Sequence, residues 1–391
     1  MKRSALLALG FVLAASLHTA AQPAPTGKVI KAAAYVGPDG KLVSEGAVVA
    51  IEGERIARVG GDVPAGTPVD EYAGAVLSPG LVDCLTTLGV LGDLAERQTA
   101  LQPDVRAADA FNRFARELRA ALAAGVTTFA LVPSDDALVG GSIAICQTGG
   151  PEGKPRMLER NGPLKLSLSQ DAFKTDREPT SRSGALGLLR EALQAGRSVN
   201  PPASDAGAAS WTPFARGQRP GVMTAPSAAD VLAALDLVDE FKLRLALIHT
   251  EGALDIAGRL RERVAAIVVG PLDMTSGLRA TRGPRLLAQQ QVPVAIAGGL
   301  PGYPADTLRI GAALAARAGL DPGLARQAIA AVPADVLGVG ERVGALAPGR
   351  QADVVVFSGD PLDLRSRVLA VYIGGQRVYL DGATAATGVR P

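Results

Sequence analysis

From Leu77 onward, β-strand patterns alternate with helical patterns along the chain. Apolar runs with the length of buried strands lie at 127–132, 243–249, 266–269 and 293–297. Segments with helical spacing of apolar residues separate most of them, which is typical of βα units and a parallel sheet. The chain has 391 residues, 48% of them hydrophobic, so one barrel with a small additional domain fits its length as well as two or three ordinary domains do. The sequence therefore predicts an α/β fold.

The two ends of the chain carry short strands instead of βα units. Near the start, alternating segments at 28–35, 46–52 and 55–59 are separated by Gly-containing turns, and similar segments return at 343–357 and 368–378. Two half-domains on either side of a barrel must meet in space to bury their apolar faces. We therefore expect one discontinuous domain built from both ends of the chain.

These patterns divide the chain into a leader at 1–21, a composite domain of short strands from 22–76 and 341–391, and a barrel-like region of alternating strands and helices at 77–340. Within the composite domain, Asp353 and Asp360 are interpreted as turn and cap residues and not as catalytic groups.

Several helices have recognisable start or stop signals. Pro103-Asp104 predicts a helix that continues to Gly125, and Ser227 is a candidate N-cap for a helix through Val238. Further helices are expected at 253–264, 306–318 and 322–331. The region 133–220 is rich in Gly, Pro and Ser, so its two barrel strands are not placed, and 198–221 is a candidate for low order.

Charge and the N-terminal segment limit the possible partners. The 40 basic and 38 acidic residues are spread along the chain, so no basic stripe indicates nucleic acid. Lys2 and Arg3 precede an apolar run from Ala5 to Leu17, and Thr19-Ala20-Ala21 follows as a cleavage pattern. The run is short for a membrane span of about 20 residues. We expect export to the periplasm or the extracellular space, with no membrane association after cleavage.

The segment Pro79-Gly80-Leu81-Val82-Asp83 resembles the entry of the first barrel strand in metal-dependent amidohydrolases, especially the imidazolonepropionase-like branch. The resemblance extends from Val29 to Val378. It implies a (β/α)8 TIM-like barrel with a small composite β-sandwich from both chain ends. It also implies hydrolysis of carbon–nitrogen bonds by a zinc-activated water at the C-terminal ends of the strands.

The family's metal ligands are replaced at most of the matching positions. In the family, the Asp of the first strand is followed by His-x-His, but Leu85 and Thr87 occupy those places here. The fifth-strand His aligns with Thr224, and the Ser-Asp of the eighth strand corresponds to Gly298 and Gly299. The sixth-strand His is matched by His249, which is the only histidine left after cleavage removes His18. Zinc needs about four ligands, so we expect no bound metal cofactor, although the family uses zinc.

Side chains other than metal ligands could carry out the chemistry in place of the metal. The candidate catalytic residues are those expected near the strand ends: His249, Asp83, Asp93, Asp135 and Asp136. Helix caps and solvated loop charges are the alternative explanation for these carboxylates. Lys165 could be imagined as a carboxylated lysine between two metals, but the rest of a dinuclear site is missing.

The sequence thus leaves two functions open. The first is a non-catalytic amidohydrolase homologue that binds a small molecule at the old pocket or supports a partner, either an active relative or a second copy. The second is a working hydrolase of amide or cyclic amide bonds with an unorthodox or metal-poor site. Cys84 and Cys146 could pair in an oxidising compartment, or Cys84 could be a small buried apolar residue on the first barrel strand.

Overall fold

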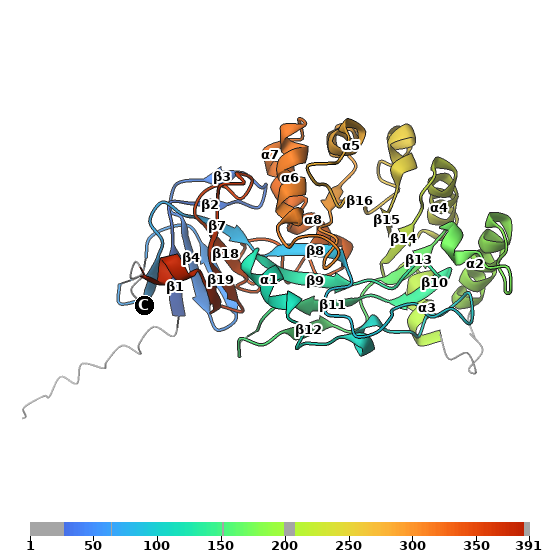
Figure 1. Ribbon diagram of the computed structural model, residues 1–391, viewed down its shortest axis with the longest axis horizontal. Helices are drawn as coiled ribbons and strands as arrows, with labels where there is room; N and C mark the ends of the chain where they lie inside the picture. Colours follow the sequence, from blue (N-terminus) through green and yellow to red (C-terminus); the bar gives the residue numbers. More distant parts are fainter. Residues whose placement is uncertain (1–26, 64, 151, 199–207, 387–391) are drawn as a thin grey trace, which may run out of the picture.

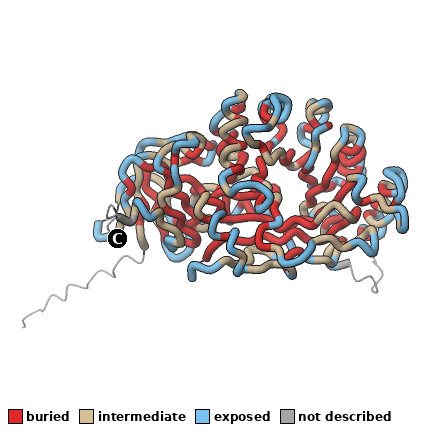
Figure 2. The backbone as a smooth tube through the Cα atoms, viewed as in Figure 1, coloured by how far each residue is buried: buried red, intermediate tan, exposed pale blue. Residues whose placement is uncertain are grey.

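The computed structural model describes residues 27–386, except 64, 151 and 199–207. The expected leader lies outside the described residues. The molecule is elongated, with the sheets of the two chain ends at one end and helices α2 and α3 at the other (Figure 1). Strands form the buried interior, whereas exposed residues lie in loops and on the outer faces of helices (Figure 2).

Seven strands of the central part run parallel to their neighbours in two groups. The first group is β8 (Leu81–Thr86) and β9 (Val126–Leu131). The second group follows the chain order and comprises β13 (Leu164–Ser167), β14 (Gly221–Thr224), β15 (Leu245–Ile248), β16 (Ala266–Val269) and β17 (Val294–Ile296). The α/β prediction is therefore confirmed, and the strands that the sequence located overlap the expected segments, with β9 beginning one residue earlier than expected.

An antiparallel segment joins the two groups. Strands β10 (Val139–Ser142) and β11 (Ala144–Gln147) form almost one continuous extended stretch. β10 pairs antiparallel with β13, and β11 pairs antiparallel with β9 on one side and with β12 (Arg156–Glu159) on the other. The sheets of the central region are consequently mixed, where a regular barrel would have parallel strands throughout.

A second irregularity separates β17 from β8. Within the described part of the chain, no hydrogen-bond ladder joins these strands, so the sheets do not close into a barrel. Instead, the Ile296 amide donates to the Ala328 carbonyl (2.8 Å), and the Val82 amide donates to the Ile329 carbonyl (2.9 Å). The backbone at 328–330 thus fills the gap, which we call the seam.

Inward-facing side chains from both groups share one hydrophobic cluster, the inner core. Its members include Val82, Cys84, Ala130, Val132, Val222, Ala246, Val268 and Ala295, together with Ala334 of helix α8 and Leu337, which follows that helix. Alternate residues of the same strands face outward and pack against helices. The strands therefore surround a common interior although their ladders are interrupted.

Helices surround the strands; most lie on the outer face, whereas α8 packs against the inner core. They are α1 (Glu117–Ala123), α2 (Arg182–Arg197), α3 (Ala208–Ala215), α4 (Ala228–Phe241), η3 (Glu251–Arg259), α5 (Leu278–Gln289), α6 (Thr307–Arg317), α7 (Pro322–Gln327) and α8 (Ala331–Val336). The predicted N-cap is confirmed, because the Ser227 hydroxyl accepts from the Asp230 amide (3.2 Å) while the Asp230 carboxylate accepts from the Ser227 amide.

Three helix predictions need correction. The helix expected from 103 to 125 is wrong: a short 3-10 turn η1 (Ala107–Ala110) and α1 replace it, because Phe111 forms a β-bridge with Val90. The segment 253–264 contains a kinked 3-10 helix, η3, and 322–331 is broken before α8 begins. Finally, part of the predicted low-order segment 198–221 is helical, because it contains α3. Residues 199–207 lie outside the described residues.

Strands from the two chain ends form two sheets. One has the order β5 (Arg55–Val59), β4 (Val48–Glu52), β1 (Gly27–Lys31), β6 (Val69–Glu71). The other has the order β20 (Gln376–Leu380), β19 (Val368–Ile373), β18 (Val354–Phe357), β7 (Val76–Pro79), β2 (Ala34–Val36), β3 (Leu42–Val43). Ile51 of the first sheet and Leu77, Val354 and Tyr372 of the second belong to one hydrophobic cluster. The predicted domain boundaries stay a prediction.

The two aspartates of these chain ends have structural partners. Asp353 is buried and accepts hydrogen bonds from the Gln147 side chain (2.6 Å) and the Gly374 amide (2.9 Å). Asp360 accepts from the Leu362 amide (2.9 Å) within its turn and pairs with Arg326 (2.6 Å). The contacts of Asp353 with Gln147 and of Asp360 with Arg326 join the C-terminal strands to the central region, in line with a packing role.

Cys84 and Cys146 are both free and buried. Cys84 faces the inner core, whereas Cys146 belongs to the cluster on the outer side of the strands. A disulfide between them is therefore not formed. Within the described residues, no helix is long and apolar enough to cross a membrane.

Candidate functional site

A buried lysine on β13 is the centre of the candidate site. Leu164 and Leu166 face the outer cluster, so Lys165 points to the interior. Its ammonium group is 2% exposed and donates to the Asp135 carboxylate, to the Thr224 hydroxyl (3.0 Å) and to the Leu166 carbonyl (3.0 Å). An ammonium group has three protons to donate. All three hydrogen-bonding directions of Lys165 are therefore used inside the protein.

We call Lys165, Asp135 and Thr224 the lysine cluster. Burial would raise the pKa of Asp135, but the Lys165 charge and hydrogen bonds from Lys165 and Thr224 outweigh it and hold the pKa below its usual value. For Lys165, burial lowers the pKa, and Asp135 opposes that effect. The geometry is that of an ammonium–carboxylate pair, and the two charges cancel each other.

His249 lies at the rim of the lysine cluster, directly after β15. Burial of the imidazole is the main reason that its pKa is lowered from 6.5; Asp135 opposes the shift and Lys165 adds to it. His249 is therefore neutral at pH 7, and the residue is buried on one side while the rest of its surface remains in solvent. A neutral imidazole can accept or donate a proton or a hydrogen bond.

The backbone of His249 supports a special role. Among the described residues, four non-glycine residues have positive φ: Lys242, His249, Glu262 and Gln291. The other three follow α4, η3 and α5 by one to three residues, where such a conformation commonly ends a helix. His249 alone ends a strand, with a φ of 50°. Left-handed backbone of this kind costs energy and is concentrated at functional sites.

Asp93 and Asp136 lie together in an exposed ion network at the strand-end loops. Arg97 bridges them, with distances of 2.9 Å to Asp93 and 3.2 Å to Asp136. Asp136 also pairs with Lys174 (2.9 Å) and accepts from the Ser134 hydroxyl (2.9 Å). These contacts fix three loops to one another, and the side-chain partners of both carboxylates lie outside the lysine cluster.

Asp83 is separated from the lysine cluster. Val82 and Cys84 face the inner core, so the side chain between them points away from it, and its carboxylate approaches Gly298. Burial raises the pKa of Asp83 to about 7, although backbone amides, chiefly those of Gly298 and Leu85, oppose this shift. One carboxylate oxygen, Oδ2, has no hydrogen-bond partner of ordinary geometry. Asp83 therefore acts in packing the seam, apart from His249 and Asp135.

The remaining positions of the family's metal site offer few ligand atoms. Leu85 is half-buried and apolar, and Thr87 is exposed with its amide bonded to the Leu300 carbonyl (3.0 Å). A Cβ on Gly298 would approach Asp83 to 2.6 Å, and one on Gly299 would approach Pro271 to 2.4 Å. Throughout the described chain, no group of three His, Cys, Asp or Glu side chains could hold a metal ion. The side chains present do not fit a zinc site.

Restoring the eighth-strand aspartate should fail in this chain. We expect Gly299→Asp to lower the free energy of unfolding by about 2–4 kcal/mol, because Gly299 has a φ of 72° and its Cβ would collide with Pro271. Thr87→Asp, which adds a carboxylate at an exposed position of the same rim, should cost less than about 1 kcal/mol. Thermal denaturation of both variants tests this, and a stable Gly299→Asp protein that binds zinc would contradict it.

The central position of Lys165 in the site was not predicted, although the sequence around it indicates that its side chain is buried. In Leu164-Lys165-Leu166-Ser167-Leu168, apolar and polar residues alternate, so the polar side chains must share one face of the strand. That face is the interior, where an unpaired charge would be costly. The pattern therefore required a buried partner, which Asp135 supplies.

Interrupted parallel strands around one interior, with a polar cluster at their C-terminal ends, define an α/β protein of barrel type. No protein-family model and no curated protein matches the chain. Among solved structures, an amidohydrolase from Thermotoga maritima MSB8 is similar, with 25% identity and a TM-score of 0.79 over 90% of this chain and all of that one. Phenylurea hydrolase B matches with 14% identity and a TM-score of 0.59 over 93% of this chain and 98% of its own.

A prolidase complexed with N-methylphosphonate-L-proline matches with 17% identity and a TM-score of 0.56, over 91% of this chain and all of that one. These likenesses show that the chain has the fold of the amidohydrolase superfamily. The likeness to the Thermotoga maritima protein also supports a relation to hydrolases of carbon–nitrogen bonds.

Proposed function

We propose that this chain binds an uncharged small molecule containing an amide group at the lysine cluster, and that it does so without a catalytic zinc ion. In this proposal the protein is a non-catalytic homologue of the amidohydrolases, related to the imidazolonepropionase-like branch, with an interrupted (β/α)8 barrel. One observation carries it: the Lys165 ammonium already uses Asp135 and Thr224, the acceptors on which a metal would depend.

Charge supports the absence of zinc. A divalent cation beside Lys165 would be repelled by the buried ammonium, and in a poorly solvated interior that repulsion is strong. His249 would then be the only good nitrogen ligand, one of the roughly four ligands that zinc requires.

Charge also indicates the kind of ligand. Lys165 and Asp135 neutralise each other and His249 is neutral at pH 7, so the cluster offers no net charge to an ionic ligand. The polar groups of the site that reach solvent, His249 and the part-exposed Asp135, suit a neutral molecule with both N–H and C=O groups. An amide, lactam or urea has this pairing of donor and acceptor.

The experiment combines metal analysis with titration of neutral amides. After dialysis against zinc and then against buffer, elemental analysis should find far less than one zinc per chain. Hydantoin and 2-pyrrolidinone should bind with measurable heats and should not be hydrolysed. Asp135→Asn should weaken that binding about tenfold, whereas Asp93→Asn, on the exposed ion network, should leave it unchanged. Stoichiometric zinc, or the absence of any binding, would overturn the proposal.

The second candidate is a metal-free hydrolase that uses His249 as general base. The specific observation in its favour is His249 itself, whose backbone is strained and whose imidazole is neutral at pH 7 and interacts electrostatically with Asp135. Hydrolysis of the same amides that falls at least a hundredfold in His249→Ala, with no zinc bound, would select this function instead.

We also propose that the protein is exported and acts in the periplasm or outside the cell, on the basis of the leader at 1–21. Association with an active relative or with a second copy belongs to the same proposal. The mass of the mature chain from a periplasmic fraction tests the cleavage after Ala21, and retention of the full leader in the cytoplasm would contradict it.

A further inference from the structure

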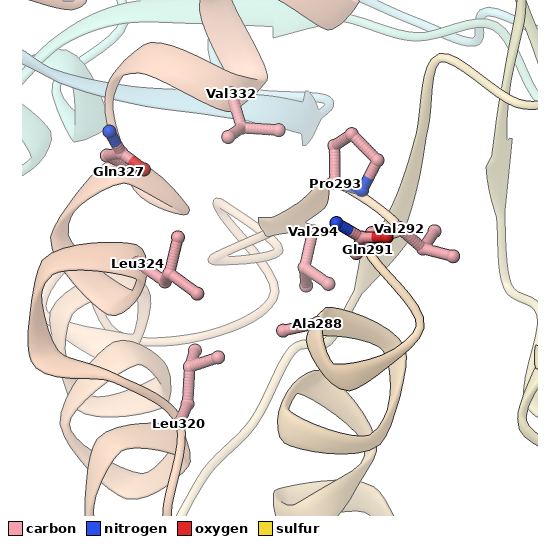
Figure 3. Close-up of a pocket in the computed structure, with 9 residues that line it drawn as sticks. All are labelled: Ala288, Gln291, Val292, Pro293, Val294, Leu320, Leu324, Gln327 and Val332. Carbon is pink, nitrogen blue, oxygen red and sulfur yellow. The ribbon is translucent and has the colours of Figure 1, made fainter. Parts of the chain in front are cut away.

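A pocket lies at the seam, next to the beginning of β17. Nine residues line it: Ala288, Gln291, Val292, Pro293, Val294, Leu320, Leu324, Gln327 and Val332 (Figure 3). They come from the end of α5, the turn into β17 and its first residue, the loop between α6 and α7, helix α7 and the start of α8. Seven of the nine are apolar and none is charged.

The two polar residues of the pocket are glutamines that lie on opposite sides of it (Figure 3). The Gln327 carboxamide donates to the Pro38 carbonyl (2.9 Å), which holds it in place. Gln291 has a φ of 58° immediately after helix α5. A carboxamide offers both a donor and an acceptor without charge, so the pocket suits a ligand that has one polar, uncharged group.

The size of the pocket limits its occupant. Its volume of about 280 Å³ corresponds to roughly nine water molecules of the bulk liquid. An α-helix with side chains is about 10 Å wide and cannot enter such a space. A compact molecule of about ten non-hydrogen atoms fills it.

Binding here would act on the seam. The Ala328 and Ile329 carbonyls, which bond to β17 and β8, directly follow Gln327 in the chain. A molecule in the pocket therefore contacts α5 on one side and the helix that leads into the seam on the other. Since such a ligand binds the folded state alone, it raises the melting temperature.

We propose that this pocket is a binding site for an uncharged, mainly apolar small molecule with a single hydrogen-bonding group, distinct from the strand-end site. Its lining shares no residue with the lysine cluster, and its position at the start of β17 is opposite to the strand ends at which that cluster lies.

Indole is a suitable probe because it is planar, uncharged, of roughly the required size and has one N–H group. In calorimetric and ligand-observed NMR titrations of the full chain, indole should bind saturably with a Kd below about 1 mM and should raise the melting temperature. Indole-3-acetate, which adds a charge, should bind at least tenfold more weakly.

Two variants on the same helix provide the matched test. Ala288→Trp fills the pocket and should weaken indole binding at least tenfold, whereas Leu286→Trp, at a 44% exposed position of α5 that does not line the pocket, should leave it unchanged. If Ala288→Trp does not fold, Leu324→Glu places a charge in the pocket from a 44% exposed position. Absence of saturable indole binding, or equal binding by the pocket variants, would overturn the proposal, while amide binding at Lys165 is unaffected by either result.

Discussion

Lys165→Met is expected to lower the free energy of unfolding by about 3 kcal/mol at pH 7. Methionine preserves the length of the side chain but removes the charge, which leaves the Asp135 carboxylate in a site that is mostly shielded from solvent. Removing one partner of a buried ion pair is far more costly than the pair itself is stabilising, because the remaining charge is not compensated. Thermal and urea denaturation measure the effect.

The pH dependence of this loss identifies its cause. Without Lys165, burial dominates and the folded-state pKa of Asp135 should exceed its unfolded value. The destabilisation should therefore be complete at neutral pH and should shrink as the pH falls and Asp135 becomes protonated.

Two controls accompany the lysine variant. Lys174→Met removes the partly exposed pair with Asp136 and should cost less than about 1 kcal/mol. Adding Asp135→Asn to Lys165→Met removes the unpaired charge and should recover most of the lost stability. A Lys165→Met protein as stable as the parent at pH 7 would show that the lysine cluster is not an ion pair.

The elements that could be predicted correctly are mostly those defined by turn or capping residues close to them in the sequence. The bounds of β5 and β16 agree with the expected segments, because each strand lies between clear turn or helix signals. Ser227 and Asp230 cap α4 within one turn of the chain. In each case the residues that determine the element are close in sequence.

The antiparallel segment 139–147 was not predictable in the same way. Gly140 and Gly141 weaken any strand pattern, and Gly141 adopts a φ of 106° in close approach to the Val105 carbonyl. Only pairing with β9 and β13, which lie before and after it in the chain, fixes its direction. The long predicted helix before Gly125 failed for a related reason, since the bridge from Val90 to Phe111 outweighs local helix spacing.

The candidate site was partly predictable. His249 and Asp135 were expected near the strand ends, and they lie near each other. Asp83 was expected in the same site, but its side chain points away from the inner core toward Gly298 at the seam. An outward or inward direction depends on the register of the strand, and β8 has irregular pairing at Asp83. The role of Lys165 follows only from its contact with Asp135, which lies thirty residues earlier in the chain.

The second large effect is expected for Asp83→Asn, and it concerns how the free energy of unfolding depends on pH. The pKa of Asp83 is about 7 in the folded protein, compared with 3.8 for an unperturbed aspartate. Between these values the folded chain holds a proton that the unfolded chain has released, so this residue makes stability fall as the pH rises from about 4 to about 7. Above pH 7 its contribution is constant. Asparagine does not titrate and lacks this decline.

The free energy of unfolding of Asp83→Asn, relative to that of the parent, should therefore rise by up to about 4 kcal/mol between pH 4 and pH 8, at about 1.4 kcal/mol for each unit of pKa shift. Asp353→Asn is the matched control, because burial raises the pKa of Asp353 only to about 6 and its change should be complete at lower pH. Denaturation at a series of pH values measures both curves. A difference between Asp83→Asn and the parent that does not change with pH would mean that Asp83 is hydrated or paired, and that the seam between β8 and β17 is open to water.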